Sequence, residues 1–401
     1  MIMVFSTSST PRLYNYLQKD KTHVHWEDDE FLRFPANMQV SKGEENLYLH
    51  RLSHSFSTIS YIVFMLMVCT RQSAGRSETE SRRSCENERS CRPPGSESLP
   101  KRIVVKTSNL ETRPLWGSPK KTSSSMSLFA VPVGIKQKIN VDKLVQKFLA
   151  SNFVVMLFHY DGNVDVWKDF QWSNQVIHVS VDNQTKWWFA KRFLHPDIVA
   201  DYDYIFLWDE DLGVENFHPS RYLSIVRDEG LEISQPALEI GESEVHHLIT
   251  ARWKRSKVHR RTYKVGGKET QCDDNSTHPP CTGWIEVMAP VFSKNAWRCV
   301  WHMIQNDLIH AWGLDMQLGY CAQGDRMKNI GVVDAEYIVH YGYPTLGEEE
   351  HTQGSLNTEK INKRVEVRRQ SYNEYKVFKR RWKKAAEEDR CWTDPYPRQT
   401  D

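Results

Sequence analysis

Short runs of consecutive apolar residues alternate with amphipathic stretches along much of the chain. The runs at 127–135, 153–162 and 202–211 are continuous, which is typical of strands buried on both faces of a parallel sheet. Between them, residues 141–152 and 185–202 carry apolar positions at helical spacing, with a break near the proline at 196. This alternation predicts an α/β fold with a mostly parallel central sheet and helices on both faces.

The same pattern continues toward the C-terminus. It predicts further strands at 175–181, 231–238, 283–292 and 337–342, and helices at 220–230 and from Ser293 onward. A basic stretch at 252–268 is expected to be a solvated loop, with phosphate neutralisation as the alternative. Together these elements predict one α/β domain at residues 105–347.

The flanking segments have other compositions. Residues 1–56 are polar and lack periodicity, so we expect them to be poorly structured, and residues 71–104 are expected to form a stem or linker. Residues 57–70 contain a short apolar run. It falls below the ~20 residues of a typical transmembrane helix but suits a signal anchor. Residues 348–401 predict a basic amphipathic helix that packs its apolar stripe on the domain, with membrane or nucleic-acid binding as weaker alternatives.

Composition narrows the functional classes. The 401 residues carry a net charge of +2, which argues against a protein built wholly around nucleic acid. The eight cysteines include no C-x-x-C pair, so a structural zinc site has little support. Cys272 and Cys281 bracket a polar loop that a disulfide would close in an oxidising compartment. Glycosylation sequons at Asn183 and Asn275 indicate the same kind of compartment.

Three acids, Asp209, Glu210 and Asp211, directly follow the apolar run. In an extended chain Asp209 and Asp211 share one face and Glu210 points away from it. Open α/β folds bind ligands beyond the carboxyl ends of their strands, and carboxylate oxygens suit Mg²⁺ or Mn²⁺. The pattern therefore indicates either a metal site that holds a diphosphate or a solvated acidic turn that caps the next helix.

Two later residues are candidates to complete such a site. Asp315 is the one acid in the largely apolar stretch 310–323, where it is either a helix N-cap or a general base in a low-dielectric pocket. His340 lies in the last predicted strand, where a histidine is either a satisfied core residue or a metal ligand at the sheet edge.

Trp284 and Glu286 begin the strand predicted at 283–292, and alternation places them on one face. A ring beside a carboxylate suits a sugar, although tryptophan is equally good core material. No G-x-x-x-x-G-K-[ST], H-E-x-x-H or G-x-S-x-G motif is present, and no G-x-G-x-x-G follows a strand. Kinase, zincin, serine-hydrolase and dinucleotide-dehydrogenase functions therefore lose their usual support.

Long blocks of the chain, among them FLWDEDLGVENFHPSRY, CTGWIEVMAPVFSKNAW and VVDAEYIVHYG, closely resemble a plant family of unknown function. Its members are often labelled "lysine-ketoglutarate reductase trans-splicing related". The resemblance covers about residues 91–347. Its members look like single-pass type II membrane proteins, which implies a Golgi or other secretory-pathway membrane and an anchor at 57–70.

The order of strand, D-x-D, acceptor strand, helix with a central acid and strand-end histidine is also similar to GT-A nucleotide-sugar glycosyltransferases, which have a Rossmann-like α/β fold. This resemblance implies that Asp209, Asp211 and His340 bind Mn²⁺ or Mg²⁺. It implies that Glu210 assists in binding the nucleotide-sugar donor.

The same resemblance implies that Asp315 is the general base, and that Trp284 and Glu286 line the acceptor side. The predicted function is then a metal-dependent glycosyltransferase of the secretory pathway, acting from a nucleotide sugar on a glycan or protein acceptor. The alternatives are a non-catalytic carbohydrate- or protein-binding module on the same fold and, less favoured, a nucleic-acid-associated protein that uses the basic tail.

Overall fold

The fold is described from a computed structural model. It describes residues 2–4, 85, 92–108, 126–263, 272–343 and 358–397, and the side chains of the last range from 365 onward. The chain forms two compact units, residues 1–5 with 92–401 and residues 6–91. Every helix and strand named below belongs to the first unit. The apolar segment 57–70 lies outside the described residues, and within them no helix is long and apolar enough to cross a membrane.

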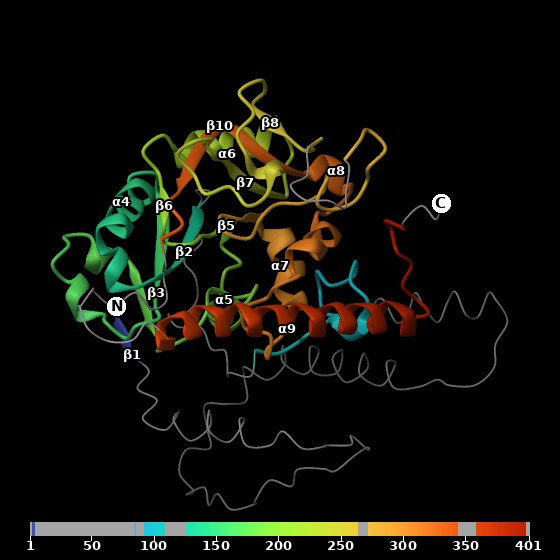
Figure 1. The fold of residues 1–401 in the computed structure, drawn as a ribbon, viewed down its shortest axis with the longest axis horizontal. Coiled ribbons are helices and arrows are strands. Elements are labelled where there is room, and N and C mark those ends of the chain that lie inside the picture. Colours follow the sequence, from blue (N-terminus) through green and yellow to red (C-terminus); the bar gives the residue numbers. More distant parts are fainter. Residues whose placement is uncertain are drawn as a thin grey trace, which may run out of the picture. The chain divides into compact units, whose positions relative to one another are not determined.

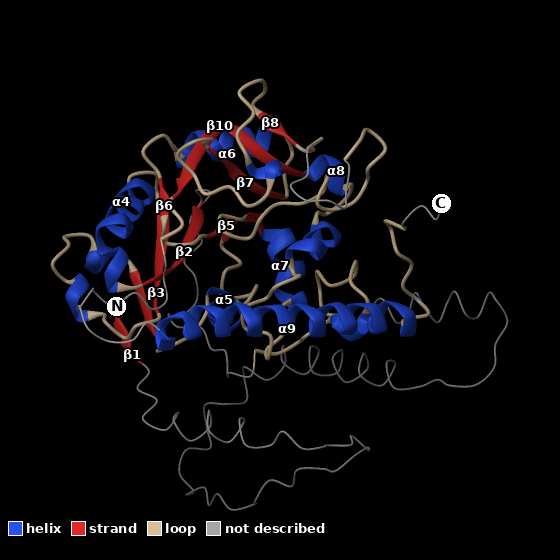
Figure 2. Cartoon of the chain, viewed as in Figure 1, coloured by secondary structure: helices blue, strands red, loops and turns tan. Residues whose placement is uncertain are grey.

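A mostly parallel sheet forms the centre of this unit (Figures 1 and 2). Its strands are β1 (Ile2–Val4), β2 (Met126–Val133), β3 (Phe153–His159), β4 (Ile177–Ser180), β5 (Tyr202–Leu207), β6 (Leu212–Gly213), β7 (Ile233–Leu238), β8 (Val258–His259), β9 (Val291–Ser293) and β10 (Ile330–His340). The order is β1-β4-β3-β2-β5-β9-β7-β10-β6, and β8 pairs with β10. The first five strands in this order are parallel, as are β7 and β10, whereas β9 runs antiparallel to both of its neighbours.

Helices cover both faces of the sheet, as the alternating pattern predicts. The α-helices are α4 (Lys138–Leu149), α5 (Lys186–Phe193), α6 (Pro219–Asp228), α7 (Lys294–Met303), α8 (Arg326–Asn329) and α9 (Thr358–Glu388). The short 3-10 helices are η1 (Lys101–Ile103), η2 (Ile135–Gln137), η3 (Asp165–Trp167), η4 (Ser173–Gln175), η5 (Leu248–Thr250) and η6 (Asp315–Cys321). One buried cluster contains residues of α4 and α6, and the other contains residues of α5, α7 and α9.

The central strands are buried because their side chains are apolar on both faces. In β2, every residue from Ser127 to Val133 is buried, and β5 ends in the buried residues Ile205, Phe206 and Leu207. On the α4 side, Phe129 stacks on Phe148 with ring centroids 3.8 Å apart. Burial of aromatic side chains on this scale makes a large favourable contribution to the free energy of folding. It also fixes where β5 ends.

The domain begins earlier than predicted. Residues 92–104, expected to be part of a linker, bury Leu99 and Ile103 completely in the cluster with α5 and α7. A buried ion pair of 2.7 Å between Arg92 and Asp389 joins this segment to the residue that follows α9. Ile2–Val4, within the extension expected to be poorly structured, forms β1 beside β4. Leu99 and Ile103 are isolated apolar residues in a polar sequence, too few to show as a periodic signal.

The basic tail forms the long helix α9, which packs on the domain (Figure 1). Phe378, Trp382 and Ala385 are buried in the cluster with α5 and α7. Arg381 makes two 2.7 Å contacts with the Asp307 carboxylate, one to each oxygen. The described part of this helix thus packs its apolar stripe inward, as predicted.

The strand predicted at 283–292 is much shorter than expected. Only Val291–Ser293 forms a strand, β9, and residues 284–290 are irregular. The amide of Leu207 donates to the Pro290 carbonyl (3.1 Å), and that of Asp209 donates to the Met288 carbonyl (2.8 Å). The segment therefore follows the end of β5 without forming a regular strand. Period-two alternation consequently does not describe Trp284 and Glu286.

The basic stretch is also more ordered than a solvated loop where the structure describes it. Arg252 pairs with Glu239 and lies 3.5 Å from the centre of the Tyr337 ring. Arg260 pairs with Glu229 at 2.9 Å. Residues 264–268 of this stretch lie outside the described residues. These arginines bind carboxylates of the domain, which satisfies their charges locally.

A buried histidine pair lies at the ends of β3 and β4. His159 Nε2 and His178 Nδ1 are 2.8 Å apart, and the rings stack with centroids 5.0 Å apart. Burial, and secondarily the charge of His178, lowers the pKa of His159 to about 3. Burial also lowers the pKa of His178. Both rings are therefore neutral in the folded protein at pH 7.

We expect this pair to make the domain sensitive to acid. In the unfolded chain both histidines gain protons near pH 6.5, whereas the folded chain resists protonation. The contribution of this histidine pair to the free energy of unfolding is therefore fully present above about pH 6.5. It is lost as the pH falls toward 3. One pKa unit corresponds to ~1.4 kcal/mol, so the loss should exceed this value. Urea unfolding between pH 7 and 4 measures it, and His159→Gln should flatten the curve. Parallel curves for both proteins would contradict the assignment.

Candidate functional site

The three consecutive acids lie where β5 leaves the sheet. The Trp208 amide still donates to the Ala130 carbonyl of β2, so the chain remains extended up to Asp209. Beyond Asp211 the chain enters β6, which pairs antiparallel with the end of β10 in the register His340 with Leu212. The amide of Tyr341 donates to the Asp211 carbonyl (3.1 Å). The sheet thus brings the end of β5 to the end of β10.

This pairing places Asp211 against His340. Asp211 Oδ2 lies 3.4 Å from His340 Nε2, and both side chains are about nine-tenths buried. His340 Nδ1 lies 2.8 Å from the Glu244 carbonyl, which can only accept, so Nδ1 carries a proton. Burial alone would lower the pKa of His340, but Asp211 and the Glu244 carbonyl raise it to about 9. Nε2 is therefore the nitrogen that faces the acids.

Asp209 is held by a residue that the sequence pattern did not single out. Lys186 Nζ, in the first turn of α5, lies 2.6 Å from Asp209 Oδ1 and 2.6 Å from the Val287 carbonyl. The Asp209 side chain is 38% exposed. Burial raises its pKa, and the charge of Lys186 opposes that shift. No local sequence signal links a lysine at a helix start to an acid at a strand end, so only the fold shows this pair.

Glu210 points away from the other two acids and is bound by the chain itself. Its Oε2 accepts from the Gly134 amide (2.7 Å), and its Oε1 accepts from the Tyr160 hydroxyl. Glu210 is 2% exposed, and burial raises its pKa to about 8 against the effect of these two donors. Both carboxylate oxygens of Glu210 are therefore occupied, and its side chain does not share the face on which Asp209 and Asp211 lie.

Glu286 lies among the candidate site residues. Its amide donates to Gln235 Oε1 of β7 (2.7 Å), which fixes its backbone. Its Oε2 is buried and lacks a hydrogen-bond partner among the described residues. Burial raises its pKa to about 7, and it feels the charges of His340, Asp315, Asp209 and Lys186. An unsatisfied buried carboxylate oxygen is costly to keep unless a ligand or a proton uses it.

Asp315 is the first residue of η6. Burial raises its pKa, while the Met316 amide and the neighbouring Trp284 indole oppose that shift. Trp284 itself is 1% exposed and packs against His247, with ring centroids 4.7 Å apart. A ring this buried has no face available for a sugar, which matches the core alternative for Trp284.

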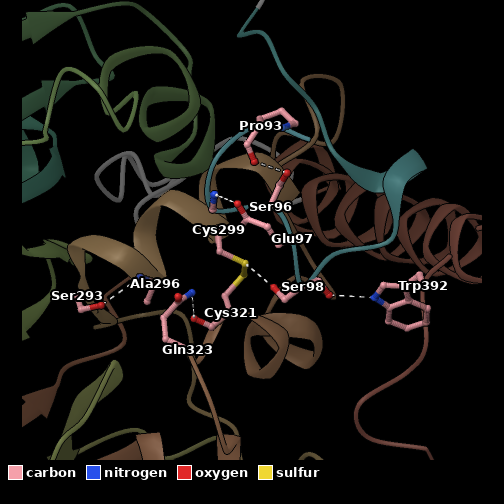
Figure 3. Close-up of a disulfide and its surroundings, with 11 residues drawn as sticks. Pro93, Ser96, Glu97, Ser98, Ser293, Ala296, Cys299, Cys321, Gln323 and Trp392 are labelled. Carbon is pink, nitrogen blue, oxygen red and sulfur yellow. Dashed lines mark hydrogen bonds between the residues drawn. A yellow bond between two sulfur atoms is a disulfide. The ribbon is translucent and has the colours of Figure 1, made fainter. Parts of the chain in front are cut away.

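A second disulfide positions Asp315. Cys299 of α7 and Cys321 at the end of η6 are bonded, and both are completely buried (Figure 3). The Ser98 hydroxyl lies 3.4 Å from the Cys299 sulfur, and the Trp392 indole donates to the Ser98 carbonyl (3.0 Å). The disulfide joins η6 to the core helix α7. The contacts of Ser98 and Trp392 connect this bond to the two segments that flank the domain. The 22-residue separation of the two cysteines gave no sequence signal for it.

The remaining predicted residues are a buried cysteine pair and two exposed asparagines. Cys272 and Cys281 are joined by a disulfide, the pair that the polar loop between them suggested. Asn183 and Asn275 are exposed, so both sequons are accessible. Neither feature lies within the cluster of acids. The disulfide and the sequons are evidence about the cellular compartment of the protein and not about its chemistry.

The structure thus brings together Asp209, Asp211, Glu286, Asp315 and His340, whose charges act on one another. The loop after β7 adds two residues that the sequence reasoning missed. A carboxylate oxygen of Glu244, a ring nitrogen of His246 and one of His340 all lie within 4.8 Å of one another. Glu244 and His246 lie in a polar loop, and their spacing does not match a known metal-binding motif. The cluster contains the oxygen and nitrogen ligands that divalent cations take in proteins.

Comparisons with known proteins show a family and a distant likeness to solved structures. No curated protein matches the chain. Among solved structures, one described as the crystal structure of S. aureus TarS is similar, with a TM-score of 0.33 and 8% identity over 54% of this chain. The chain spans 36% of the length of that structure. A family model described as "Protein of unknown function (DUF707)" matches residues 90–388, most of the chain, and the chain therefore belongs to that family.

Proposed function

We propose that this chain is a metal-dependent, GT-A-like glycosyltransferase that moves a sugar from a nucleotide sugar to a hydroxyl of a glycan or protein acceptor. The observation that carries the proposal is the meeting of Asp211 and His340 at the end of β5, with Asp209 beside them. The carboxyl end of a sheet strand is where open α/β folds hold phosphate-containing ligands.

The side chains fit a divalent cation. Asp211 and Asp209 offer carboxylate oxygens, and His340 offers Nε2 while its Nδ1 donates to a backbone carbonyl. A hydrogen bond from the other ring nitrogen to a carbonyl orients metal-ligating histidines in this way. Asp209, Asp211 and His340 would hold the ion. When bound, Mn²⁺ or a similar ion neutralises the charge that develops on a departing diphosphate.

Two carboxyl groups are candidates for the general base. In the proposed reaction an acceptor hydroxyl oxygen bonds to the anomeric carbon, the bond from that carbon to the diphosphate oxygen breaks, and the hydroxyl proton passes to a carboxylate. Burial raises the pKa of Asp315, and Glu286 has a pKa of about 7 and a free oxygen. A base with a pKa near the working pH transfers protons efficiently. Asp315 is our first choice, and Glu286 either holds the acceptor or takes the same proton.

Lys186 adds a positive charge at the donor side. Its side chain is 9% exposed and is paired with Asp209. Movement of this ammonium from Asp209 to a phosphate oxygen would release the carboxylate for the cation. Lys186 is therefore proposed as a positioning residue for the donor diphosphate.

The proposed location is the lumen of the secretory pathway, on a Golgi or related membrane. The disulfides Cys272–Cys281 and Cys299–Cys321 support an oxidising compartment. Exposed sequons at Asn183 and Asn275 are compatible with it. Occupied glycans on either asparagine in protein from a eukaryotic host would support the proposal. Reduced cysteines and bare asparagines would contradict it.

A donor screen tests the proposed function. The full-length chain, loaded with Mn²⁺, is titrated with a panel of nucleotide sugars, and release of nucleoside diphosphate is followed with mixed glycan acceptors. We expect binding of at least one donor, and its loss when Mn²⁺ is chelated. If no donor binds, the non-catalytic binding-module alternative is favoured instead.

The assignment of the base predicts a separation of binding from turnover. Asp315→Asn is expected to lower kcat by ~10²–10⁴-fold, the usual contribution of general-base catalysis. Metal-dependent donor binding should stay unchanged. Glu286→Gln is the paired variant, and exposed Glu242→Gln is the control for loss of one carboxylate. Isotope-labelled donor turnover gives kcat, and calorimetry gives the donor Kd. If Glu286→Gln alone lowers kcat, the roles of the two carboxyls are exchanged.

A further inference from the structure

We propose that Glu244 and His246 complete the cation site at Asp211 and His340, so that the ion has two imidazole and two carboxylate ligands and is a nitrogen-accepting divalent transition metal rather than Mg²⁺. The inference rests on the proposed function in placing a cation at Asp211 and His340. It goes further by naming two more ligands and the class of metal.

The ligand atoms already lie together. One atom from each of Glu244, His246 and His340 lies within 4.8 Å of the other two. His246 Nε2 is 3.8 Å from Glu244 Oε1, and the rings of His246 and His340 have centroids 5.7 Å apart. Asp211 Oδ2 lies 3.4 Å from His340 Nε2, the ring nitrogen that does not bind the Glu244 carbonyl. Small side-chain rotations of the exposed Glu244 and His246 would bring these atoms onto one ion.

The backbone of the loop is bound to the strand that carries His340. The Glu244 amide donates to the His340 carbonyl (2.9 Å), and His340 Nδ1 donates to the Glu244 carbonyl (2.8 Å). The His340 amide donates to the Ser243 hydroxyl (3.1 Å). Three hydrogen bonds thus fix the segment against the strand end. A surface loop that presents ligands by chance would not need to be bound to the other ligand in this way.

Gly342 makes room for the Glu244 carboxylate. Its φ is +65°, and a Cβ at this position would lie 1.9 Å from Glu244 Oε2. Gly342 lies two residues after His340. A larger residue there would force the Glu244 carboxylate away from the strand end. The close approach of this carboxylate to the strand end therefore depends on a glycine. This gives a second way to move Glu244 without removing its charge.

The ligand chemistry selects the metal. Asp209 is paired with Lys186 at 2.6 Å and becomes available to the ion only when that ammonium moves to a donor phosphate. Without a donor, the ligands near the ion are therefore Asp211, His340, His246 and Glu244. Mg²⁺ strongly prefers six oxygen ligands, including several waters. Imidazole nitrogens favour ions such as Zn²⁺, Co²⁺ and Mn²⁺, with affinity rising along the transition series. A set with two histidines therefore predicts strong discrimination against Mg²⁺.

Metal titration of the full-length chain tests the inference. After chelator treatment, calorimetry with Zn²⁺ and Co²⁺ should show one ion per chain, and Mg²⁺ should bind at least ~100-fold more weakly. His246→Gln and Glu244→Gln should each weaken Zn²⁺ binding by more than ~100-fold, the loss expected for a direct ligand, and Asp211→Asn should do the same because it shares the ion. Gly342→Ala should weaken it while every ligand stays in place. The visible spectrum of bound Co²⁺ should change in His246→Gln.

The same loop offers matched controls. Glu242 is exposed, and His247 packs on Trp284, so Glu242→Gln and His247→Gln should bind Zn²⁺ as the unaltered chain does. The inference is overturned if Zn²⁺ does not bind, if the Glu244 and His246 variants bind normally, or if Asp211→Asn retains full affinity. Thermal unfolding of the metal-free variants verifies that they fold.

The result is separable from the proposed function. A chain that binds Zn²⁺ through these residues but binds no nucleotide sugar keeps the metal site and refutes the transferase. A chain that uses a donor equally well with Mg²⁺, and is indifferent to His246→Gln, keeps the transferase and refutes the extended ligand set.

Discussion

Asp211→Asn is expected to abolish metal-dependent binding of nucleoside diphosphate by the full-length chain. The Asp211 side chain is 9% exposed, faces His340 Nε2 at 3.4 Å, and lies where the two strand ends meet. Mutation of residues that only support a metal ligand typically costs 10–100-fold in metal affinity. Loss of a direct ligand should therefore exceed ~100-fold. Calorimetric titration of uridine or guanosine diphosphate with Mn²⁺ measures the effect.

The control for this prediction is Asp201→Asn, which removes one exposed carboxylate just before β5. It should leave diphosphate binding unchanged, and both variants should show the circular dichroism of the unaltered protein. Asparagine preserves the shape of the aspartate, so the variant mainly removes charge. Equal diphosphate affinity for Asp211→Asn and the unaltered chain would exclude Asp211 from a metal–diphosphate site.

Removal of the buried disulfide should have the largest effect on stability. The double variant Cys299→Ala with Cys321→Ala opens a loop closed over 22 residues in the core. Chain-entropy arguments give ~3 kcal/mol for a loop of this size, and measured losses range over ~2–5 kcal/mol. Thermal and urea unfolding should show a lower free energy of unfolding. Because η6 starts at Asp315, we also expect slower sugar transfer with donor binding retained.

The disulfide between Cys272 and Cys281 supplies the control. Cys272→Ala with Cys281→Ala opens a separation of nine residues around an otherwise polar loop. It should also reduce stability, but it should not slow transfer, since this loop does not carry a candidate site residue. If both double variants slow transfer equally, the effect is one of general stability and not of the position of Asp315.

The sheet and its coverage were predictable because the signal is local. In β2, β3 and β5 the side chains are apolar on both faces, and helices with one apolar face separate them. Such a pattern leaves few other ways to bury the surface. The end of β5 at Leu207, shortly before Asp209–Asp211, follows from the same signal, since charged residues cannot continue a buried strand without partners.

The extent of the domain and of the strand at 284–290 could not be predicted in this way. Ile103 and Leu99 are isolated apolar residues in a polar segment, and their burial depends on a gap beside α7 and α9. Residues 284–290 are apolar enough for a strand, but they meet the end of β5 through single hydrogen bonds and turn away. Tertiary packing overrode the local propensity in both places.

The sequence by itself determined the α/β class, the place of the acids after a core strand and the candidacy of Asp315 and His340. Only the tertiary structure decided which of these residues meet. It paired Asp211 with His340, Asp209 with Lys186 and Glu210 with Tyr160. It also brought Glu244 and His246 to the same strand end. These contacts join residues up to about 130 positions apart, so their distances depend on strand order and register, which no local pattern encodes.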